Sequence, residues 1–452
     1  MAGLGMRSVL LCGRRSVAFS RGQWSRVLST YDIVVTGGGM VGSAFACSCG
    51  MSEWLKQKKV LLLEAGSPEV YHTPPLTYSN RVSAIAPSSR KLFQNCDAWE
   101  TMVKLRVQRV RELKVWESCS NSRISFDQPD KELEVAHIIE NKAIVSALLH
   151  SLQTNCSNVE LRTKSKMKSC TLPKDLNQPV RIELEDGDRL ECKLVVGADG
   201  FQSQVRRAMG EEYVAWQYGQ KALVATLSVS QEGTNDTAWQ RFSPNGPIAI
   251  LPLNHNTSSL VWSTTPEEAD RLVQLDKDVF VDQLNAALWD ESQLDSLSNQ
   301  ALFALDSVWN AVCPTGASDA IRLPPTVIDV AEGSRASFPL GLGHPSHYVA
   351  PRVALIGDAA HRIHPLAGQG VNLGFGDVTC LISVLESALK SGADLGSVLH
   401  LREYENTRQR HNVPVMVAMD WLNRLYRYSW WPVVLVRSLG LSSVHRLTPL
   451  KV

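Results

Sequence analysis

Short hydrophobic runs recur along this chain, and each leads into glycines or an acidic residue before a segment of helix length. The runs are "YDIVV" from Tyr31, "KVLLLEAG" from Lys59, "LVVGADG" from Leu194 and "RVALIGD" from Arg352. Uninterrupted aliphatic runs of this length are typical of strands buried on both faces of a parallel sheet. The pattern predicts an α/β fold with a Rossmann-like domain.

A different pattern fills residues 211–337. Apolar and polar positions form amphipathic runs in "KALVATLSVS" from Lys221, "TAWQRFSP" from Thr237 and "PIAILPLNHNTSSLVWST" from Pro247. Such runs between turn residues favour an antiparallel sheet, and residues 270–299 have a helical pattern. We therefore predict a second domain built on an antiparallel β-sheet.

Composition limits the classes of protein to consider. The chain has 452 residues, of which 44% are hydrophobic and 20% charged, which is enough for a large folded core. The formal net charge of +1 gives no indication of a nucleic-acid partner. No run of eighteen apolar residues occurs, so we expect no membrane-spanning helix.

The N-terminus is basic and contains no acidic residue before Asp32. Serine and threonine are interleaved with five arginines, which are Arg7, Arg14, Arg15, Arg21 and Arg26. This composition is typical of a mitochondrial transit peptide, which we place at residues 1–28. The alternative is a disordered basic arm.

The C-terminal residues 421–452 also contain no acid. Tryptophan is mixed with cationic side chains, namely Trp421, Trp430, Trp431, Arg424, Arg427, Arg437, Arg446 and Lys451. A helical segment at 411–452 with this composition suits an anionic membrane interface, which would give peripheral membrane contact. Packing onto the protein's own core or onto a partner subunit is the competing interpretation.

Cysteine and histidine give no indication of a metal site. The chain has ten cysteines without a C-x-x-C pair, and we interpret them as reduced core residues. His361 and His364 lack a nearby third ligand, so we expect them to shape a loop and assign neither to catalysis. No catalytic side chain is assigned.

The first hydrophobic run leads into a glycine-rich motif. Gly37, Gly39 and Gly42 satisfy G-x-G-x-x-G, in which the glycines allow a tight turn, a close pyrophosphate and close helix packing. The following helix would direct its positive end at the phosphates. Glu64 ends the second run 22 residues after Gly42, where a carboxylate can bind ribose hydroxyls and would repel a 2′-phosphate. The motif predicts FAD or an NAD-like nucleotide.

Two later motifs distinguish between these nucleotides. "GADG" places Asp199 at the end of the third run, and "GDAAHRIHPLAGQGVN" places Asp358 at the end of the fourth. Asp358 can accept a hydrogen bond from a sugar-alcohol hydroxyl. Backbone N–H groups of Gly368, Gly370 and Val371, at a helix start, can stabilise a negative ring edge, which a reduced flavin carries.

These three motifs together resemble the single-component flavin aromatic hydroxylases, whose prototype is para-hydroxybenzoate hydroxylase. "SNRVSAIAPSS" (79–89), "ENKAIVSALLHSL" (140–152) and "FPL" (338–340) are similar to the ubiquinone-biosynthesis monooxygenases in particular. The resemblance covers roughly residues 31–415, and the transit-like N-terminus points to the mitochondrial eukaryotic branch.

The resemblance implies a role for each motif residue. Gly37, Gly39, Gly42 and Glu64 would hold the ADP half of FAD, and Arg81 and Asp199 would lie near the pyrophosphate. Asp358 would bind the ribityl and pyrophosphate region, and the isoalloxazine would be surrounded by Pro365, Gly368, Gly370, Val371 and Asn372. Alternatives stay open for two of them, because Arg81 could be a surface ion-pair partner and Asp199 could merely cap the following helix.

The resemblance also implies an activity and a set of partners. The expected reaction is FAD-dependent hydroxylation of a polyprenylated 4-hydroxybenzoate-type ring by O2 in ubiquinone biosynthesis, through a flavin hydroperoxide. Electrons would come from ferredoxin and ferredoxin reductase, and other ubiquinone-biosynthesis proteins would form a complex with the chain. The expected location is the matrix side of the mitochondrial inner membrane.

A division into domains follows. We expect a discontinuous FAD-binding domain at 29–107, 136–210 and 338–410, and a substrate domain at 108–135 and 211–337. Residues 305–333 depart from the pattern of bacterial relatives and are interpreted as an inserted loop that serves partners or substrate access, or as a tolerated surface insertion.

Two rival functions share the same fold. A flavin oxidase or dehydrogenase would oxidise a substrate without inserting oxygen, and a prenyl-binding escort protein would have no enzyme activity and no flavin. Retention of Asp199, Asp358 and the "GQGVN" loop argues against the escort protein.

Overall fold

The structure is a computed structural model that describes residues 28–127, 134–173, 175, 177–230, 233–290, 294–295, 298, 300 and 323–446. The predicted transit peptide lies outside the described residues, except for Leu28 at the start of the first strand. Most of the predicted insertion also lies outside them, and its described part begins at Leu323.

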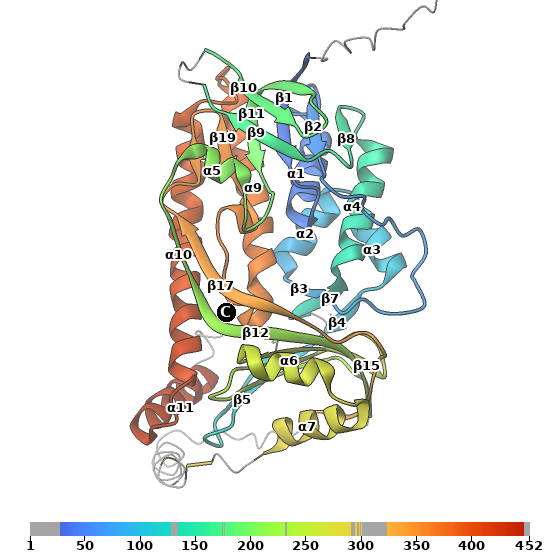
Figure 1. Ribbon diagram of the computed structural model, residues 1–452, viewed down its shortest axis with the longest axis vertical. Helices are drawn as coiled ribbons and strands as arrows, with labels where there is room; N and C mark the ends of the chain where they lie inside the picture. Colours follow the sequence, from blue (N-terminus) through green and yellow to red (C-terminus); the bar gives the residue numbers. More distant parts are fainter. Residues whose placement is uncertain are drawn as a thin grey trace, which may run out of the picture.

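The first domain is built on a mainly parallel sheet with strand order β18-β19-β11-β1-β2-β8 (Figure 1). Its parallel strands are β1 (Leu28–Thr36), β2 (Val60–Leu63), β8 (Val159–Arg162), β11 (Arg189–Gly197) and β19 (Val353–Leu355). Antiparallel strands β9 (Met167–Thr171), β10 (Val180–Leu184) and β18 (Val349–Ala350) extend it. The predicted Rossmann-like domain is confirmed.

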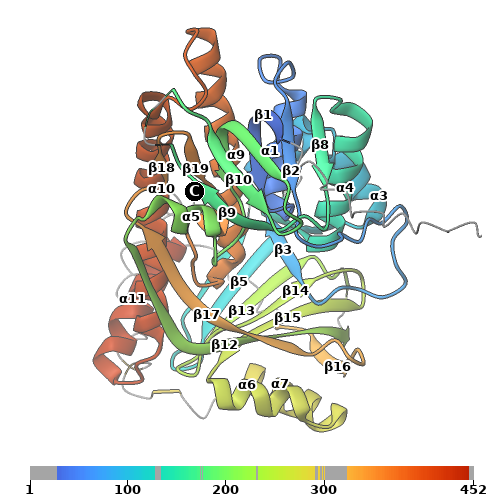
Figure 2. The same cartoon turned by 45° about the horizontal axis from the view of Figure 1, so that its top comes forward.

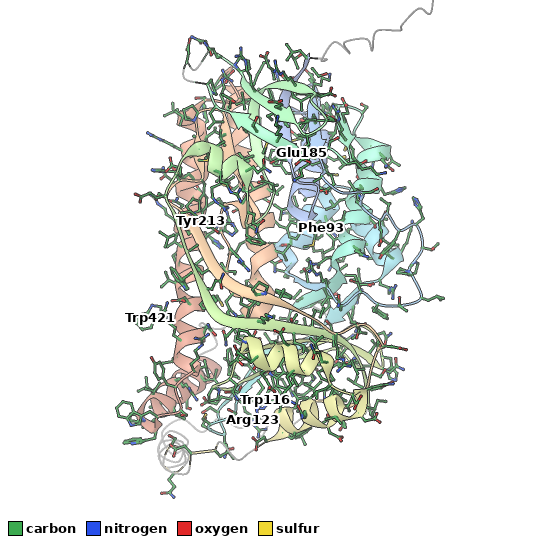
Figure 3. All side chains as sticks on the ribbon, in the orientation of Figure 1. Phe93, Trp116, Arg123, Glu185, Tyr213 and Trp421 are labelled. Atoms are coloured by element: carbon green, nitrogen blue, oxygen red, sulfur yellow. The ribbon has the colours of Figure 1, made fainter. Side chains whose placement is uncertain are left out.

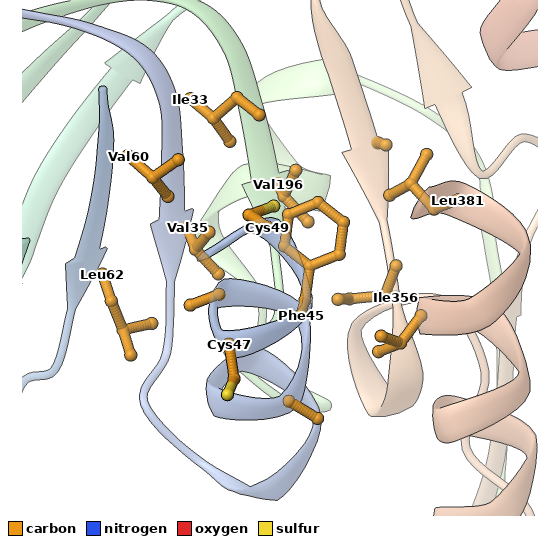
Figure 4. Packing of buried hydrophobic residues seen from close by; sticks show 14 of the residues in the cluster. Ile33, Val35, Phe45, Cys47, Cys49, Val60, Leu62, Val196, Ile356 and Leu381 are labelled. Atoms are coloured by element: carbon orange, nitrogen blue, oxygen red, sulfur yellow. The ribbon is translucent and has the colours of Figure 1, made fainter. Parts of the chain in front are cut away.

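Helices enclose this sheet, and its core lies between the strands and α1. The helices are α1 (Met40–Met51), α2 (Pro87–Asn95), α3 (Trp99–Leu105), α4 (Asn141–Asn155), α5 (Gln204–Met209) and α9 (Gln369–Lys390). Figure 4 shows Phe45 of α1 among Val35, Val196 and Ile356, all fully buried. Helix α9 is long and apolar enough to cross a membrane by length and composition, but half of that stretch is buried in this core.

The second domain is a larger curved sheet with strand order β16-β12-β15-β14-β13-β5-β6, in which β17 also pairs with β12. The strands are β5 (Glu112–Glu117), β6 (Arg123–Asp127), β12 (Tyr213–Ser230), β13 (Thr237–Phe242), β14 (Ile248–Pro252), β15 (Thr257–Thr264), β16 (Thr326–Val330) and β17 (Ala336–Pro345). The sheet is antiparallel as predicted, except that β13 and β5 are parallel. Two helices, α6 (Pro266–Gln274) and α7 (Lys277–Trp289), cover one face where one helical stretch was expected (Figure 2).

A small antiparallel sheet of β3 (Val82–Ile85), β7 (Ala136–Glu140) and β4 (Gln108–Val110) lies between the two domains (Figure 1). The strand pairing differs from the expected division at two places. Residues 338–345 belong to β17 in the second sheet, and residues 108–110 belong to this small sheet. The sequence did not show these differences because they depend on pairing between distant segments.

Helix α10 (Val398–Tyr426) runs along both domains, and α11 (Trp431–Arg446) follows it beside the second sheet (Figures 1 and 2). The helical C-terminus is confirmed. Arg437 of α11 forms a buried ion pair with Glu117 of β5, with Nε 2.6 Å from Oε2. Helix α11 is therefore packed onto the core through Arg437, as the competing interpretation of this segment proposed.

Candidate functional site

The turn after β1 has a backbone that only glycine can provide. Gly37 has φ of +100°, and a Cβ on it would lie 2.4 Å from the carbonyl oxygen of Ala198. A Cβ on Gly42 would lie 1.9 Å from the carbonyl oxygen of Gly37, so α1 can only start this close with glycine there. A Cβ on Gly39 would meet nothing within 4 Å. Gly37 and Gly42 therefore allow close packing, and Gly39 leaves open space at the N-terminus of α1.

The carboxylate of Glu64 lies beside this turn. Its Oε2 accepts a hydrogen bond from the Gly38 N–H at 2.7 Å, and its Oε1 accepts one from the Gly66 N–H at 2.6 Å. Each carboxylate oxygen can accept a second hydrogen bond. Glu64 is therefore held rigidly with acceptor capacity left for hydroxyl groups.

Asp199, at the end of β11, uses only one of its two oxygens within the protein. Oδ2 accepts a hydrogen bond from the Gln204 N–H at 2.8 Å and so caps α5, as the structural alternative proposed. Oδ1 is buried and has no hydrogen-bond partner in the described part of the chain. A buried carboxylate oxygen without a partner is costly, so this atom is suited to a bound group.

Arg206 joins the second and third motifs, a role that the sequence did not reveal. Its guanidinium donates to the Ala359 carbonyl at 2.8 Å and to the Phe201 carbonyl at 2.6 Å, and it stacks on the ring of Tyr213. Burial lowers the pKa of Arg206. The side chain fixes the "GADG" turn against the "GDAA" turn.

Asp358 follows Gly357, whose φ is +60°, at the end of β19. The side chain is accessible to solvent, yet the protein around it raises its pKa by desolvation, against the lowering effect of His361 and Arg362. Because the carboxylate of Asp358 keeps accessible surface, it can accept hydrogen bonds from a ligand.

A buried carboxylate supports the "GDAAH" turn from behind. Asp377 of α9 accepts hydrogen bonds from the Gly357 N–H at 2.9 Å and from Arg408 Nε at 2.7 Å, and His361 Nε2 lies 2.6 Å from its Oδ2. Despite burial, which acts to raise it, the pKa of Asp377 is lowered by His361 and Arg408. The interpretation of His361 as a loop-shaping residue fits this arrangement.

The loop before α9 is held by the side chain of Asn372. Its Oδ1 accepts hydrogen bonds from the Ala86 N–H and the Ser89 hydroxyl, and its Nδ2 donates to the carbonyls of Ala84 and Gly368. All four hydrogen bonds of the amide are thus made within the protein. Asn372 supports the loop and has no capacity left for a ligand.

Helix α9 begins directly after this loop. Gly368 has φ of +62°. Its N–H donates to the Pro365 carbonyl at 3.2 Å, so this N–H is not the free donor to the ring edge that the sequence predicted. Gly370 and Val371 lie in the first turn of α9, which no side chain caps. The first turn of a helix is where N–H groups can point at an anionic group.

Arg81 is exposed immediately before β3, and its side chain forms no ion pair with any described residue. Its carbonyl accepts a hydrogen bond from the Asn141 N–H. Two residues into β3, Ala84 lies so close to Gly368 that a Cβ on Gly368 would be 3.2 Å from the Ala84 Cβ. The strand that follows Arg81 therefore reaches the loop before α9.

The three motifs thus come together at the carboxyl ends of β1, β11 and β19. This edge of the sheet combines an open glycine backbone at Gly39, an oxygen of Asp199 without a partner in the described part of the chain, and the accessible carboxylate of Asp358. Ligands of open α/β sheets bind at this edge. The residues present fit a bound dinucleotide.

Comparison with known proteins agrees with this geometry. The family described as "FAD binding domain" matches residues 31–308 and 337–417. The mitochondrial ubiquinone biosynthesis monooxygenase COQ6 of Xenopus tropicalis is 48% identical over 428 residues, covering 94% of this chain and 92% of that protein. The human protein of the same name is 45% identical over 440 residues, covering 96% and 94%.

A solved structure shows the same fold at low sequence identity. PqsL, a probable FAD-dependent monooxygenase from Pseudomonas aeruginosa, superposes with a TM-score of 0.66 at 19% identity. The match covers 92% of this chain and all of that one.

Proposed function

This chain belongs to the FAD-binding monooxygenases of mitochondrial ubiquinone biosynthesis, and we propose that it hydroxylates the ring of a polyprenylated 4-hydroxybenzoate-type intermediate. It is an FAD-dependent monooxygenase, and family membership favours this reading over an oxidase and over an escort protein. The observation that carries the proposal is the meeting of three motifs around the open backbone at Gly39 and the unpartnered Asp199 Oδ1.

Different residues around the sheet edge would bind different parts of the cofactor. The turn at Gly37, Gly39 and Gly42 takes the pyrophosphate, and Glu64 takes the ribose hydroxyls of the ADP half. Asp199 Oδ1 and Arg81 would lie near the pyrophosphate, and Asp358 would bind the ribityl and pyrophosphate region. Pro365, Gly368, Gly370 and Val371 would hold the isoalloxazine, in a loop that Asn372 holds in place.

The bound flavin supplies the oxygen-activating chemistry, and the chain supplies orientation and a dry pocket. We call the loop before α9, which contains Pro365 and Gly368, the flavin loop. The second sheet faces this loop. On β14 and β15, Ala249, Leu251 and Val261 keep accessible surface, whereas alternate residues on the other face are buried under α6 and α7. Leu251 packs against the same buried cluster as Ala84, and Val261 against the same buried cluster as Ile363, so this accessible face lies on the side of β3 and the loop before α9. The apolar face is suited to a substituted phenol ring.

The reaction can be tested with purified, FAD-loaded protein, a polyprenylated 4-hydroxybenzoate and ¹⁸O2. We expect one ¹⁸O atom in the ring of the product. An oxidised product without ¹⁸O would support an oxidase or dehydrogenase, and a colourless protein that cannot be loaded with FAD would support an escort protein. The intermediate that accumulates in cells lacking the protein would identify the substrate.

Peripheral membrane contact is the second part of the proposal. Exposed apolar side chains follow one another along α10 and α11, with Trp421 69%, Trp430 67% and Val436 66% accessible. Figure 3 shows Trp421 at the outer edge of the molecule. The cations contribute less than the sequence indicated, because Arg437 is buried and Arg424 pairs with Asp420 at 2.8 Å. The side chains of Arg446 and Lys451 lie outside the described residues.

The location and the electron donor follow from the same family. The relatives are named mitochondrial, and a prenylated substrate resides in lipid, so the matrix side of the inner membrane is the proposed location. Ferredoxin with its reductase is the proposed donor, and other ubiquinone-biosynthesis proteins are the proposed partners. Comparing turnover with reduced ferredoxin and with NADPH alone tests the donor, since turnover with NADPH alone would exclude the need for ferredoxin.

A further inference from the structure

Beside Pro365, four side chains each carry at least one buried polar atom without a hydrogen-bond partner in the described part of the chain. Within the described residues, no partner at full hydrogen-bond geometry is found for the Tyr218 hydroxyl, both ring nitrogens of His364, Asp420 Oδ1 or Asn423 Nδ2, although Asp420 lies close enough to interact with the Tyr218 hydroxyl. Their surroundings are mainly apolar, formed by Leu340, Leu342, Ile363 and Met416. We call these four residues the Tyr218–Asn423 cluster.

The four side chains belong to one site. The rings of Tyr218 and His364 are 5.1 Å apart, and the charge of Asp420 acts on both of them. Asn423 lies one turn from Asp420 on α10, and one further turn on, Arg427 donates to the Tyr218 carbonyl at 2.8 Å. Burial, with Arg427 nearby, lowers the pKa of His364 to about 4, so its imidazole is neutral at physiological pH.

Leaving these atoms unpaired would be costly. Each buried polar group without a partner costs about 1–3 kcal/mol, and five such atoms lie in this one site. Proteins satisfy such groups with buried water wherever the site offers two or more polar partners. The cluster offers donors and acceptors on several sides, so ordered water can satisfy all of them.

The cluster has one end at the surface and one at the flavin loop. At the outer end, Asp420 Oδ2 accepts a hydrogen bond from Arg424, whose side chain is largely exposed. At the inner end, His364 directly precedes Pro365, which is part of the proposed isoalloxazine site. Polar atoms therefore extend from solvent to the loop that holds the ring.

Ring hydroxylation by this family requires protons inside the protein. The balanced reaction is ArH + O2 + 2 e⁻ + 2 H⁺ → ArOH + H2O, with the two electrons supplied by an external reductant. A donor that transfers electrons alone brings neither proton. A packed site between two domains then needs a route for protons from solvent.

We propose that the Tyr218–Asn423 cluster holds a chain of ordered water that conducts protons between the surface at Asp420 and the flavin loop at His364. A neutral imidazole accepts a proton at one nitrogen and donates from the other, and the Tyr218 hydroxyl can do the same. Asn423 can only orient a water molecule. The proposal rests on the proposed function for its purpose, but the route would serve any reaction that reduces the bound flavin.

Proton uptake can be measured without substrate. The FAD-loaded protein is reduced anaerobically by a light pulse in weak buffer with a photosensitiser and a sacrificial electron donor, and a pH indicator dye follows FAD + 2 e⁻ + H⁺ → FADH⁻. We expect proton uptake to be slowed about tenfold or more in Tyr218→Phe and His364→Gln, with FAD affinity and protein stability near those of the wild type. Asp420→Asn should slow uptake as well, because it changes the outer end.

Tyr348→Phe is the matched control, since the Tyr348 hydroxyl is also buried but lies beside His344 and His361, outside the cluster. Its proton uptake should equal that of the wild type. Wild-type uptake in folded, FAD-loaded Tyr218→Phe and His364→Gln would overturn the proposal. Unchanged proton uptake together with weaker binding of a phenol would also overturn the proposal, and would indicate that the cluster binds the hydroxyl group of the substrate ring. If the wild-type protein does not hydroxylate the substrate but proton uptake is still slowed in the variants, only the proposed function is rejected.

Discussion

The Nε2 atom of His361 lies 2.6 Å from Oδ2 of Asp377, and both side chains are fully buried behind the turn that presents Asp358. The same carboxylate oxygen accepts the Gly357 N–H, and Oδ1 binds Arg408 and Asn412. One ionised side chain on α9 thus fixes a turn at the end of β19. This contact joins residues 16 positions apart on two different elements, and it explains why "GDAAH" ends in histidine.

Replacing Asp377 by Asn should destabilise the protein by about 3–5 kcal/mol, because it leaves the buried Arg408 cation without its counter-ion. Urea unfolding measures this. Asp329→Asn breaks a largely exposed pair with Lys277 and should lower stability far less. Equal losses in the two variants would contradict the role given to Asp377.

Gly39→Val should abolish FAD binding with little effect on folding, because a side chain there meets no protein atom and instead fills the proposed pyrophosphate space. Absorbance of the purified protein and FAD titration of the apoprotein measure this. Gly440→Val is the control, since its Cβ also meets nothing within 4 Å but lies on α11. Normal flavin content in Gly39→Val would be incompatible with the assignment.

Arg206→Lys should weaken FAD binding by about tenfold or more, because an ammonium group cannot donate to both Ala359 and Phe201 in place of the guanidinium fork. Isothermal titration of apoprotein with FAD gives the affinity. Arg207→Lys, at the neighbouring exposed position, should bind FAD like the wild type. If both variants bind equally well, Arg206 does not position the two turns.

Stability should fall as pH decreases from about 6.5 to about 4. Burial lowers the pKa of His364 from 6.5 to about 4 in the folded protein, so the unfolded chain binds more protons in this window. The shift corresponds to about 3 kcal/mol when the window has been crossed. Urea midpoints measured across this range should fall less in His364→Gln than in the wild type. His255→Gln, at an exposed position, should leave the wild-type slope unchanged.

Trp421→Ser combined with Trp431→Ser should weaken binding to cardiolipin-containing liposomes by about tenfold, because both side chains are exposed and contribute apolar area to the proposed interface. Sedimentation with liposomes measures this. Trp54→Ser is the control, since Trp54 is 43% exposed near α1 in the first domain. Deleting residues 421–452 is a poorer experiment, because it removes Arg437 and leaves Glu117 buried without its cation.

Sequence reasoning recovered the elements whose signal is local. The strand before Gly37 and the acid at Glu64 could be read directly, because hydrophobic runs and glycine spacing are properties of short segments. The contacts of Arg206 with Ala359, and of Asn372 with Ala84, could not be read. They join residues more than 150 positions apart, and only strand order places such residues together.

The C-terminal segment is a second case in which the sequence pattern did not predict the positions of the side chains. Its tryptophans and arginines form one pattern in the sequence, yet the structure separates them. Trp421 and Trp430 are exposed, whereas Arg437 is buried against Glu117. Composition gives the kinds of side chain on a helix, but the direction of each depends on what the helix packs against.

Helix α10 forms part of the wall of both domains as one continuous element of 29 residues. At one end Tyr404 donates a hydrogen bond to the Leu355 carbonyl of the first sheet, and at the other Tyr426 stacks on Phe242 of the second. Because one helix contacts both sheets, any movement of one domain relative to the other would have to bend α10 or break one of these two contacts.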